Sequence, residues 1–368
     1  MKPRYPVYVI SKGRWKTPMT ARFLKRDGVD FRVVVEPQEA EEYGRAVGAE
    51  RVLVLPFSNL GQGSIPARNW CWEHAREAGA ERHWILDDNI GMIRRLYHGK
   101  RIPCDSGPAF ASIEDFVERY ENVAVGGMNY QMFGVPGIAP YHVNCHVYSA
   151  LLIRNDLEFR WRGRLNEDTD LCLQALTSGW CTLLVNVFLI DKKTTMTMKG
   201  GNTEDLYQGD GRLEMSRSLQ RAWPGIVDVK MRYGRHAHVI DWTRFADAPA
   251  LRLRPGVDLD ALEPNEYGLT LKAVAEVKSP ALRRLLEQAR EEAGIGADLP
   301  ITTEEALQPP QPPPTSRPPW PGEDGFLEWV VEEHRAGRIL TAGALQCYAD
   351  HQAALAGPPA FVGAEPGT

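Results

Sequence analysis

The stretch HWILDDNI, His83 to Ile90, joins a short apolar run typical of a buried strand directly to two aspartates and an asparagine. Carboxylates removed from water without a partner are costly, by several kcal/mol per ion. In a parallel α/β sheet, ligands bind beyond the carboxyl ends of the strands. We therefore expect Asp87, Asp88 and Asn89 to emerge at the ligand-binding edge of such a sheet. An Asx turn or a helix cap is the alternative for this triplet taken alone.

Short β-rich runs alternate with helical patterns on both sides of this stretch. The predicted strands cover residues 6–11, 31–36, 51–56, 83–86, 122–127 and 146–154, and the predicted helices cover residues 17–27, 38–47, 66–79 and 168–178. Such alternation is typical of βαβ units on a mainly parallel sheet. We predict an α/β core over residues 1–245.

Three further segments are predicted after this core. Residues 246–300 are less periodic, hold one helix at 280–293, and are expected to pack on the core as an extension. Residues 301–322 include a proline-rich run that predicts an extended linker. Residues 323–368 predict a small helical tail, whose apolar stripe suits a docking face or a mini-core.

The overall composition is that of an ordinary globular protein, with 368 residues, 43% hydrophobic and 25% charged. A formal net charge of -5 argues against a globally basic nucleic-acid coat, although a local basic groove remains compatible with it. The chain has no apolar run of the kind found in signal peptides or membrane helices, so we expect a soluble, intracellular protein without membrane contact. Six cysteines without a CxxC pair predict reduced thiols, neither a zinc cage nor a disulfide framework.

A second cluster of acids lies at the start of the helix predicted at 168–178. Glu167, Asp168 and Asp170 fall within four residues. Acids at this end of a helix are favoured by its dipole, by about 0.3–1 kcal/mol each. Three of them exceed what capping requires, and clustered carboxylates raise one another's pKa values, which suits a general base.

A third feature is the glycine-containing loop GQGSIPARNWCWEHA, residues 61–75, which leads into a helix. Arg68 and Asn69 lie close to the start of that helix, where phosphate groups are attracted. The loop matches neither a Walker loop nor GxGxxG, so a dinucleotide site is a poor interpretation.

Taken in order, the segments YVISKGR, GSIPARNW, HWILDDNI and NEDTDLCLQAL resemble the GT-A fold glycosyltransferases. They are most similar to the TET-associated glycosyltransferases, which bacteriophages encode alongside TET/JBP-type dioxygenases and which are linked to glycosylation of hydroxymethylated bases in phage DNA. The resemblance covers about residues 4–245. It implies a GT-A (Rossmann-like), mostly parallel sheet flanked by helices, and a metal-dependent transferase of the hexosyltransferase class that uses a nucleotide-sugar, expected to be a UDP-sugar.

The resemblance also implies roles for the matching residues. Asp168 would be the catalytic base, supported by Glu167, with Asp170 as the rival base. Asp87 and Asp88 would contact the ribose and the metal-bound diphosphate. The remaining predicted donor contacts are Ser11, Lys12, Arg14, Arg68, Asn69 and Lys199.

Several of these assignments have alternatives. A solvated basic turn would also explain Lys12 and Arg14. Lys199 lies in a polar, glycine-rich segment, residues 191–211, that suits a mobile loop with Lys192, Lys193 or Lys199 near phosphate, and a disordered surface loop explains its composition equally well.

A divalent cation, Mn²⁺ or Mg²⁺, is the expected cofactor, with Asp88, Asn89 and His238 as ligands. Asn89 departs from the family pattern, in which this position is commonly Asp, and it is a weaker ligand. His236 and His238 would point the same way on a strand, and either also suits a surface histidine.

The acceptor is expected to be 5-hydroxymethylcytosine in phage DNA, modified in the host cytoplasm in one pathway with a TET-like dioxygenase. A Gly/Pro-rich loop and an arginine-rich turn are the predicted acceptor wall, contributing Tyr130, Tyr141, His142, Arg160, Arg162 and Arg164. Core closure by the aromatic residues and a solvated turn for the arginines are the alternatives.

We expect transfer by a single displacement with inversion, although one sequence does not exclude retention. The competing functions are a GT-A glycosyltransferase acting on a saccharide, protein or small molecule, a metal-dependent nucleotidyltransferase, and a non-catalytic nucleotide- or DNA-binding module.

Overall fold

The computed structural model describes residues 2–97, 99–136, 138–163, 165–193, 211–232, 234–246, 249–259, 261–263 and 265. All of them lie in Met1–Leu271, the first of the two units into which the chain divides. Arg164, Lys199, the helix predicted at 280–293, the predicted linker and the predicted tail lie outside the described residues.

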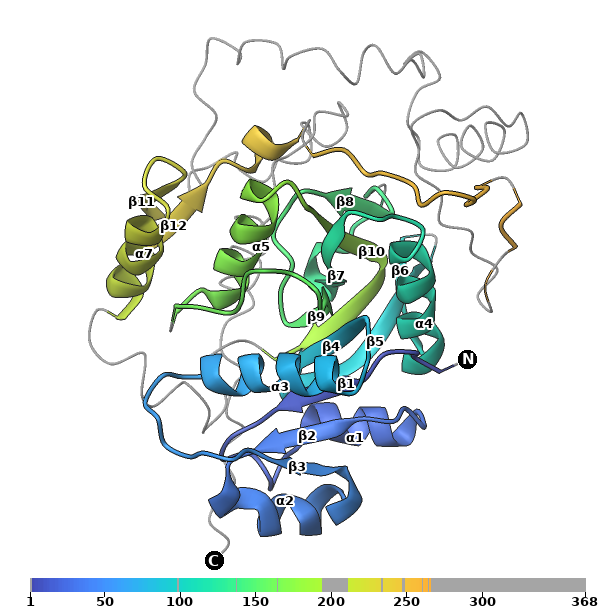
Figure 1. Ribbon diagram of the computed structural model, residues 1–368, viewed down its shortest axis with the longest axis vertical. Coiled ribbons are helices and arrows are strands. Elements are labelled where there is room, and N and C mark those ends of the chain that lie inside the picture. The colour runs from blue at the N-terminus through green and yellow to red at the C-terminus, as the bar shows by residue number, and fades with distance from the viewer. Residues whose placement is uncertain are drawn as a thin grey trace, which may run out of the picture. The chain divides into compact units, whose positions relative to one another are not determined.

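A ten-stranded sheet forms the centre of this unit (Figure 1). The strand order is β3-β2-β1-β4-β9-β7-β10-β5-β6, and β8 pairs with β10 beside this path. The strands are β1 (Val7–Ile10), β2 (Arg32–Val35), β3 (Val52–Val54), β4 (Arg82–Asp87), β5 (Ile90–Tyr97), β6 (Lys100–Cys104), β7 (Val123–Tyr130), β8 (Tyr141–Val143), β9 (Ala150–Arg154) and β10 (Cys181–Lys192).

Most strands of this sheet run in one direction. β1 is parallel to β2 and β4, β2 is parallel to β3, and β7 is parallel to β10. β9 runs against its neighbours β4 and β7, while β5 and β8 run against β10. The predicted α/β fold, a GT-A-type, mostly parallel sheet flanked by helices, is confirmed.

Helices cover both faces of the sheet. They are α1 (Met19–Arg26), α2 (Ala40–Val47), α3 (Ile65–Glu77), α4 (Ser106–Val117), α5 (Glu167–Thr177) and α7 (Gly211–Ala222), with short 3-10 turns η1 (Pro37–Glu39), η2 (Ala49–Arg51), η3 (Gln131–Phe133) and η4 (Trp242–Phe245). Successive side chains of a strand point to opposite faces. On β4, Trp84 packs on Phe110 of α4, whereas Ile85 belongs to the core cluster that holds Trp72 of α3 and Leu171 of α5.

The end of β4 is fixed in position by α1. The strand is buried from Arg82 to Leu86 and becomes partly exposed at Asp87. Thr20 of α1 donates through Oγ1 to the carbonyl oxygen of Asp87 at 2.6 Å, and the same hydroxyl accepts from the backbone N of Ile90 at 3.0 Å. The Asp-Asp-Asn turn is therefore held at both of its ends.

A separate two-stranded antiparallel sheet follows α7 and consists of β11 (Val227–Arg232) and β12 (Arg235–Ile240). Val227, at its base, belongs to an apolar cluster with Leu173 of α5 and Leu219 of α7. Burial of this cluster anchors the hairpin to α5.

Residues 249–254 contact the main sheet near the start of β7. Asn122 donates through Nδ2 to the carbonyl oxygen of Ala250 at 2.7 Å and accepts from the backbone N of Arg252 at 2.9 Å. Arg254 forms an ion pair with Glu118, with Nη2 2.9 Å from Oε2. The described chain beyond residue 245 thus contributes partners to buried polar groups of the core.

None of the described helices is both long enough and apolar enough to cross a membrane.

Candidate active site

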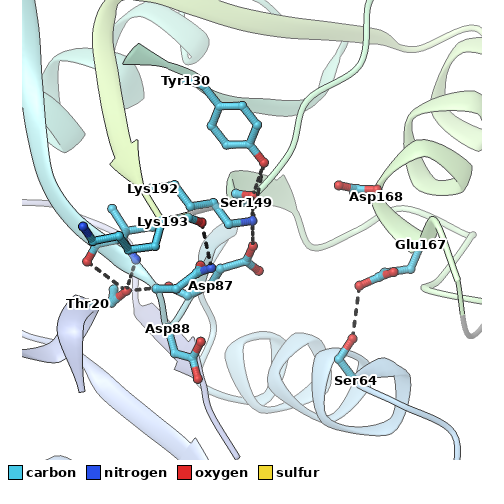
Figure 2. Close-up of polar contacts among 12 residues, drawn as sticks. Thr20, Ser64, Asp87, Asp88, Tyr130, Ser149, Glu167, Asp168, Lys192 and Lys193 are labelled. Carbon is cyan, nitrogen blue, oxygen red and sulfur yellow. Dashed lines mark hydrogen bonds and ion pairs between the residues drawn. The ribbon is translucent and has the colours of Figure 1, made fainter. Parts of the chain in front are cut away.

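Asp87 lies between two cations at the carboxyl end of β4. Its Oδ2 accepts a hydrogen bond from Nζ of Lys192 at 2.7 Å (Figure 2), and its Oδ1 lies 3.3 Å from Nη2 of Arg68. Burial alone would raise the pKa of this carboxyl, but Lys192 and Arg68 outweigh burial and hold the pKa below its ordinary value. Asp87 is therefore ionised, and its charge is balanced from β10 and α3.

Lys192 is the last residue of β10, and oxygen atoms surround its ammonium group. Besides Asp87, it donates to Ser149 Oγ at 2.8 Å, and its Nζ lies 3.4 Å from the hydroxyl of Tyr130. Burial alone would lower the pKa of Lys192, but the Asp87 carboxylate reverses this effect and raises the pKa. Lys192 is consequently a fixed positive charge at neutral pH.

Ser149, just before β9, has a left-handed backbone with φ of 63°. For a residue with a β-carbon this conformation costs about 1 kcal/mol or more and is typical of functional sites. Its hydroxyl lies 2.7 Å from that of Tyr130, in addition to its bond with Lys192. The strand predicted over residues 146–154 therefore begins only at Ala150, because residue 149 leaves the extended conformation.

Asp88 points away from Lys192 (Figure 2) and toward the end of β1. Ser11 Oγ donates to its Oδ2 at 2.6 Å, and the Arg14 guanidinium pairs with its Oδ1. Tyr43 of α2 supports this arrangement, since its hydroxyl lies 2.5 Å from Ser11 Oγ and accepts from the backbone N of Arg14 at 3.0 Å. Three predicted donor-binding residues, Ser11, Arg14 and Asp88, are thus in direct contact.

Lys12 lies at the outer edge of that cluster. Its side chain is 44% exposed and its Nζ lies 3.0 Å from Glu36 Oε2. It also donates to Asn59 Oδ1 at 3.2 Å. The charge of Lys12 is therefore directed to Glu36 at the surface.

Arg68 connects Asp87 to the acidic start of α5. Its Nη2 lies 3.4 Å from Glu167 Oε1, and its Nε donates to Ser64 Oγ at 3.1 Å. The guanidinium group lies over the ring of Trp161, 4.5 Å from the centroid. Its Nη1 is buried and has no hydrogen-bond partner within the described residues. A guanidinium with a spare donor suits an anionic substrate group.

Asn69, beside Arg68 in the sequence, is used differently. Its Nδ2 donates to the carbonyl oxygen of Trp161 at 2.9 Å, and its Oδ1 accepts from the backbone N of Trp161 at 3.1 Å. The amide thus holds the loop before α5 against α3, so it supports the site from the protein side.

Glu167 and Asp168 are the first residues of α5 and extend toward the end of β4 (Figure 2). Burial raises the pKa of Glu167, whose Oε1 accepts from Ser64 Oγ at 3.2 Å. Burial alone would also raise the pKa of Asp168, but His146 and Arg68 outweigh burial and hold this pKa below its ordinary value. The Nε2 of His146 lies 3.4 Å from Oδ1 of Asp168. Asp168 is therefore the ionised acid of the pair, and the expectation that clustering raises its pKa is wrong, because His146 and Arg68 outweigh burial.

Asp170 is engaged in contacts of another kind. It is 3% exposed and accepts from Arg162 Nε at 3.1 Å, from Gln174 Nε2 at 2.8 Å and from Trp223 Nε1 at 2.7 Å. These bonds join α5 to the preceding loop and to the end of α7. Both oxygens of Asp170 thus have protein donors, as expected of a structural anchor.

The predicted acceptor arginines form internal ion pairs. Arg160 donates through Nε to Glu73 Oε1 at 2.9 Å, and Arg162 pairs with Asp170. Arg164 lies outside the described residues. The two described arginines therefore brace the loop before α5 against α3 and α5.

The predicted acceptor aromatics are spread over the sheet. Tyr130 lies at the site beside Ser149 and Lys192. Tyr141 packs against Phe116 of α4, with ring centroids 4.8 Å apart, and His142 is exposed on β8. Tyr130 is therefore a predicted acceptor aromatic that the structure places at the site, through Ser149 and Lys192.

The predicted metal ligands fall into two groups. Asp88 and Asn89 are adjacent in the turn after β4, and Asn89 Oδ1 is buried without a hydrogen-bond partner in the described part of the chain. His238 lies on β12, where burial lowers its pKa to about 4 and where the charges of His146 and Asp168 act on it. The described residues contain no group of three His, Cys, Asp or Glu side chains placed to hold a metal.

Asp88 and Asn89 nevertheless carry oxygen donors of the type that a nucleotide-bound ion takes, with both carboxylate oxygens of Asp88 already in contact with Ser11 and Arg14. Mg²⁺ and ions like it take few protein ligands at such sites, typically one or two carboxylates, and substrate phosphates and water supply the rest. The carboxylate of Asp88 and the unpartnered oxygen of Asn89 are hard donors of the right type. His238 belongs to the surroundings of Asp168 instead.

Sequence reasoning missed three residues of the site and misplaced a fourth. Tyr43, His146 and Ser149 were not predicted, and no local pattern distinguishes them. Lys192 was considered only as part of a mobile loop, although it directly follows the apolar run of β10. The strand-end rule that identified Asp87 would have found Lys192 as well.

A family model described as TET-Associated Glycosyltransferase matches residues 5–201, just over half of the 368-residue chain. The matched segment includes every site residue described above except His238 and Trp223. No match was found among curated proteins.

Proposed function

The chain belongs to the TET-associated glycosyltransferase family, and from this premise we propose that it transfers a sugar from a UDP-sugar to the hydroxyl of 5-hydroxymethylcytosine in phage DNA. Glycosyl transfer is the activity of the family. The donor, the acceptor base and the mechanism are our proposal. One observation carries it: the ionised Asp168 faces a strand end at which Lys192 and Arg68 supply positive charge.

The donor is proposed to bind along the ends of β1 and β4. The cluster of Ser11, Arg14 and Asp88 offers an acceptor for ribose hydroxyls and a cation for phosphate. Lys192 and Arg68 then neutralise the diphosphate as it departs. Since both cations are held by Asp87, they keep their positions before the donor arrives.

Asp168 is proposed to act as the general base. It accepts the proton of the acceptor hydroxyl while that oxygen forms a bond to the anomeric carbon. The bond from this carbon to the diphosphate oxygen breaks, and UDP leaves with the electron pair. Attack opposite the leaving group inverts the anomeric centre. Glu167 contributes by holding Arg68 in place.

Mn²⁺ or Mg²⁺ is part of the proposal, with Asp88 and Asn89 as its protein ligands. Such an ion, when bound, supplies further positive charge to the diphosphate.

The acceptor base must leave the DNA stack to reach Asp168, at a cost of a few kcal/mol. Tyr130 is proposed to meet an extruded base with its hydroxyl edge, because Lys192 lies over its ring and Tyr148 packs against it. The hydroxymethyl group would come from a TET-like dioxygenase acting earlier on the same DNA, in the cytoplasm of the infected host.

The test uses purified protein with a panel of UDP-sugars and duplex DNA that carries either cytosine or 5-hydroxymethylcytosine. Parallel reactions contain Mn²⁺, Mg²⁺ or EDTA, and nucleoside mass spectrometry detects the product. We expect the mass of one sugar to be added to the hydroxymethylated base alone. Asp168→Asn should reduce the rate by about 10²–10⁴-fold, the usual contribution of a general base, while UDP binding is retained.

Other outcomes would replace parts of the proposal. Hydrolysis of a UDP-sugar without transfer to DNA would mean a saccharide, protein or small-molecule acceptor. In a parallel reaction with UTP in place of the UDP-sugar, release of pyrophosphate would indicate a nucleotidyltransferase. Salt-dependent DNA binding without any turnover would indicate a binding module.

A further inference from the structure

The β11–β12 hairpin stands beside the catalytic residues and lies outside the segment matched by the family model. Its strands pair Val229 with His238 and Met231 with His236. Directly paired residues share a face of a two-stranded sheet, and so do alternate residues along each strand. These four side chains therefore lie on one face, together with Val227 at the base.

The surroundings of this face change from the base of the hairpin to its tip. Val227 is buried in the cluster with Leu173 and Leu219. His238, in the middle, is close enough to His146 and Asp168 for their charges to act on it. Met231, near the tip, is 56% exposed. The face thus runs from the core, past the catalytic acid, to an exposed apolar side chain. Figure 1 shows the hairpin beside α7, on the side of the sheet that carries α5.

The tip of the hairpin is basic. Arg232 and Arg235 pair directly across the two strands, and Gly234 makes the turn with φ of 68°. By the same alternation the two arginines lie on the face opposite to Met231 and His238, so the tip has charge on one face and an exposed apolar side chain on the other. Among the described residues, neither arginine has an ion-pair partner. Like charges placed opposite each other destabilise a strand pair. An anion shared between the two guanidinium groups would remove that repulsion and form charge-assisted hydrogen bonds.

The donor does not account for this charge. The cations for its diphosphate are Arg14, Lys192 and Arg68, gathered around Asp87 and Asp88. The hairpin instead flanks Asp168, the residue that meets the acceptor. A tip with two guanidinium groups and one exposed apolar side chain suits a ligand that is anionic along its backbone and apolar between its bases, which describes DNA.

The distances are compatible with this ligand. Arg235 precedes His238 by three residues, or about 10 Å along an extended strand. This equals about three base steps at the 3.4 Å rise of duplex DNA. A nucleotide extruded toward Asp168 would therefore leave its neighbouring phosphates within reach of the tip.

We infer that the β11–β12 hairpin is the arm that holds the DNA acceptor, with Arg232 and Arg235 bound to phosphates that flank the target nucleotide and Met231 packed into the gap that the extruded base leaves. This inference rests on the proposed function, because it requires DNA as the acceptor. It adds a DNA-binding element to the proposed function. The predicted acceptor arginines Arg160 and Arg162 do not provide this element, because they pair with Glu73 and Asp170.

The first test compares two double variants of the full chain that remove the same charge. Arg232→Gln with Arg235→Gln alters the hairpin, and Arg22→Gln with Lys25→Gln alters exposed positions on α1. Affinity for a fluorescent duplex with one 5-hydroxymethylcytosine is measured by anisotropy over a range of salt concentrations. We expect the hairpin variant to bind about tenfold or more weakly, and its salt slope to fall by about 1.8, or about 0.9 for each phosphate that is no longer neutralised. The DNA affinity of the α1 variant should stay within twofold of that of the native protein. The rate of donor hydrolysis without DNA should stay within twofold of the native rate in both variants.

The second test examines Met231. A duplex with 2-aminopurine next to the target base brightens when the base is extruded. We expect Met231→Ala to weaken this signal and to slow transfer to duplex DNA about fivefold, while transfer to a single-stranded oligonucleotide is unchanged. Met132→Ala, which alters another exposed methionine, on η3, is the matched control.

The outcomes separate this inference from the proposed function. If the native protein glycosylates duplex DNA and the arginine variant keeps its affinity and salt slope, the hairpin is not the DNA arm, although the function stands. Unaltered extrusion in Met231→Ala would likewise remove the role of Met231. If the native protein neither binds nor modifies DNA, the acceptor assignment is wrong, and the inference falls with it.

Discussion

At the scale of single residues, His146 controls the pH at which Asp168 can act. Its ring lies 3.4 Å from the carboxylate and, with Arg68, holds the pKa of Asp168 below the ordinary 3.8. A base with a lowered pKa stays deprotonated as the pH falls until that lowered pKa is reached. Activity that depends on Asp168 should therefore be retained down to pH values below 4 and disappear only under stronger acid.

His146→Gln should move this acid limb. Without the imidazole, burial raises the pKa of Asp168, by about one unit or more for the loss of one close favourable partner. The expected result is an acid limb of kcat/KM at higher pH, with a smaller change at pH 8, where the carboxylate is ionised in both proteins. The measurement is a pH–rate profile at constant ionic strength, with His142→Gln on β8 as the control. An acid limb that does not move would show that His146 does not act on the base.

Lys192 offers a second prediction at this scale, because its effect on stability can be separated from its effect on UDP binding. Lys192→Met leaves the Asp87 carboxylate with Arg68 as its remaining cation. We expect the free energy of unfolding to fall by about 1–3 kcal/mol, less than for a fully buried pair because Asp87 is 26% exposed.

Adding Asp87→Asn to Lys192→Met removes the unbalanced charge and should restore most of that stability, whereas UDP binding should remain weak in both variants. Urea unfolding and calorimetric titration with UDP measure the two effects. Equal stability of the single and double variants would show that the unbalanced Asp87 charge is not what destabilises Lys192→Met.

At the scale of elements, Asp170 joins α5 to the loop before it and to the end of α7. Asp170→Asn keeps the shape of the side chain but weakens its bonds to Arg162 and Trp223. We expect the free energy of unfolding to fall by about 1–3 kcal/mol, while kcat changes only a few-fold. Asp168→Asn should show the reverse, with a large loss of kcat and little loss of stability. A collapse of kcat in a stably folded Asp170→Asn protein would make Asp170 the base after all.

Much of the site was predictable because its residues occupy the ends of elements that local patterns define. The strand-end rule and the helix-start motifs identified Arg68, Asp87, Asp88, Glu167 and Asp168, and the family resemblance added Ser11 and Arg14. The structure brings these residues together at the ends of β1 and β4 and the starts of α3 and α5. Each of these positions follows an apolar run or opens an amphipathic one. The residues that carry the chemistry therefore lie within a few positions of the strand and helix ends that place them.

The rest depends on pairing between distant segments. The strand-end rule can place Lys192 at the edge of the sheet, but its contact with Asp87 depends on the pairing of β10 with β5, with Lys192 opposite Ile90, a register that no short pattern encodes. Arg160 and Arg162 looked like free cations because their partners, Glu73 and Asp170, become neighbours only after folding. Single-sequence reasoning identifies the residue types in such cases and misses their partners.

At the scale of the whole molecule, the end of the folded domain is the property that the sequence pattern left least defined. The α/β core was predicted to end at residue 245, with residues 246–300 packing on it, and residues 249–254 supply partners to buried groups of that core. Asn122, fully buried, bonds to the backbone of Ala250 and Arg252, and Asn144 donates to the carbonyl oxygen of Pro249 at 2.8 Å. A buried polar group that loses its partner costs about 1–3 kcal/mol.

Two shortened chains test where the domain ends. A chain of residues 1–245 leaves Asn122 without these partners, and we expect its free energy of unfolding to be about 2–4 kcal/mol below that of residues 1–271. The 1–271 chain keeps every described site residue and the whole hairpin, so its stability should lie within about 1 kcal/mol of the full protein and its donor hydrolysis within twofold. Urea unfolding and release of UDP measure the two properties. Equal stability of the two shortened chains would mean that the contacts of residues 249–254 do not stabilise the fold. Loss of hydrolysis in a stably folded 1–271 chain would mean that residues 272–368 take part in the reaction.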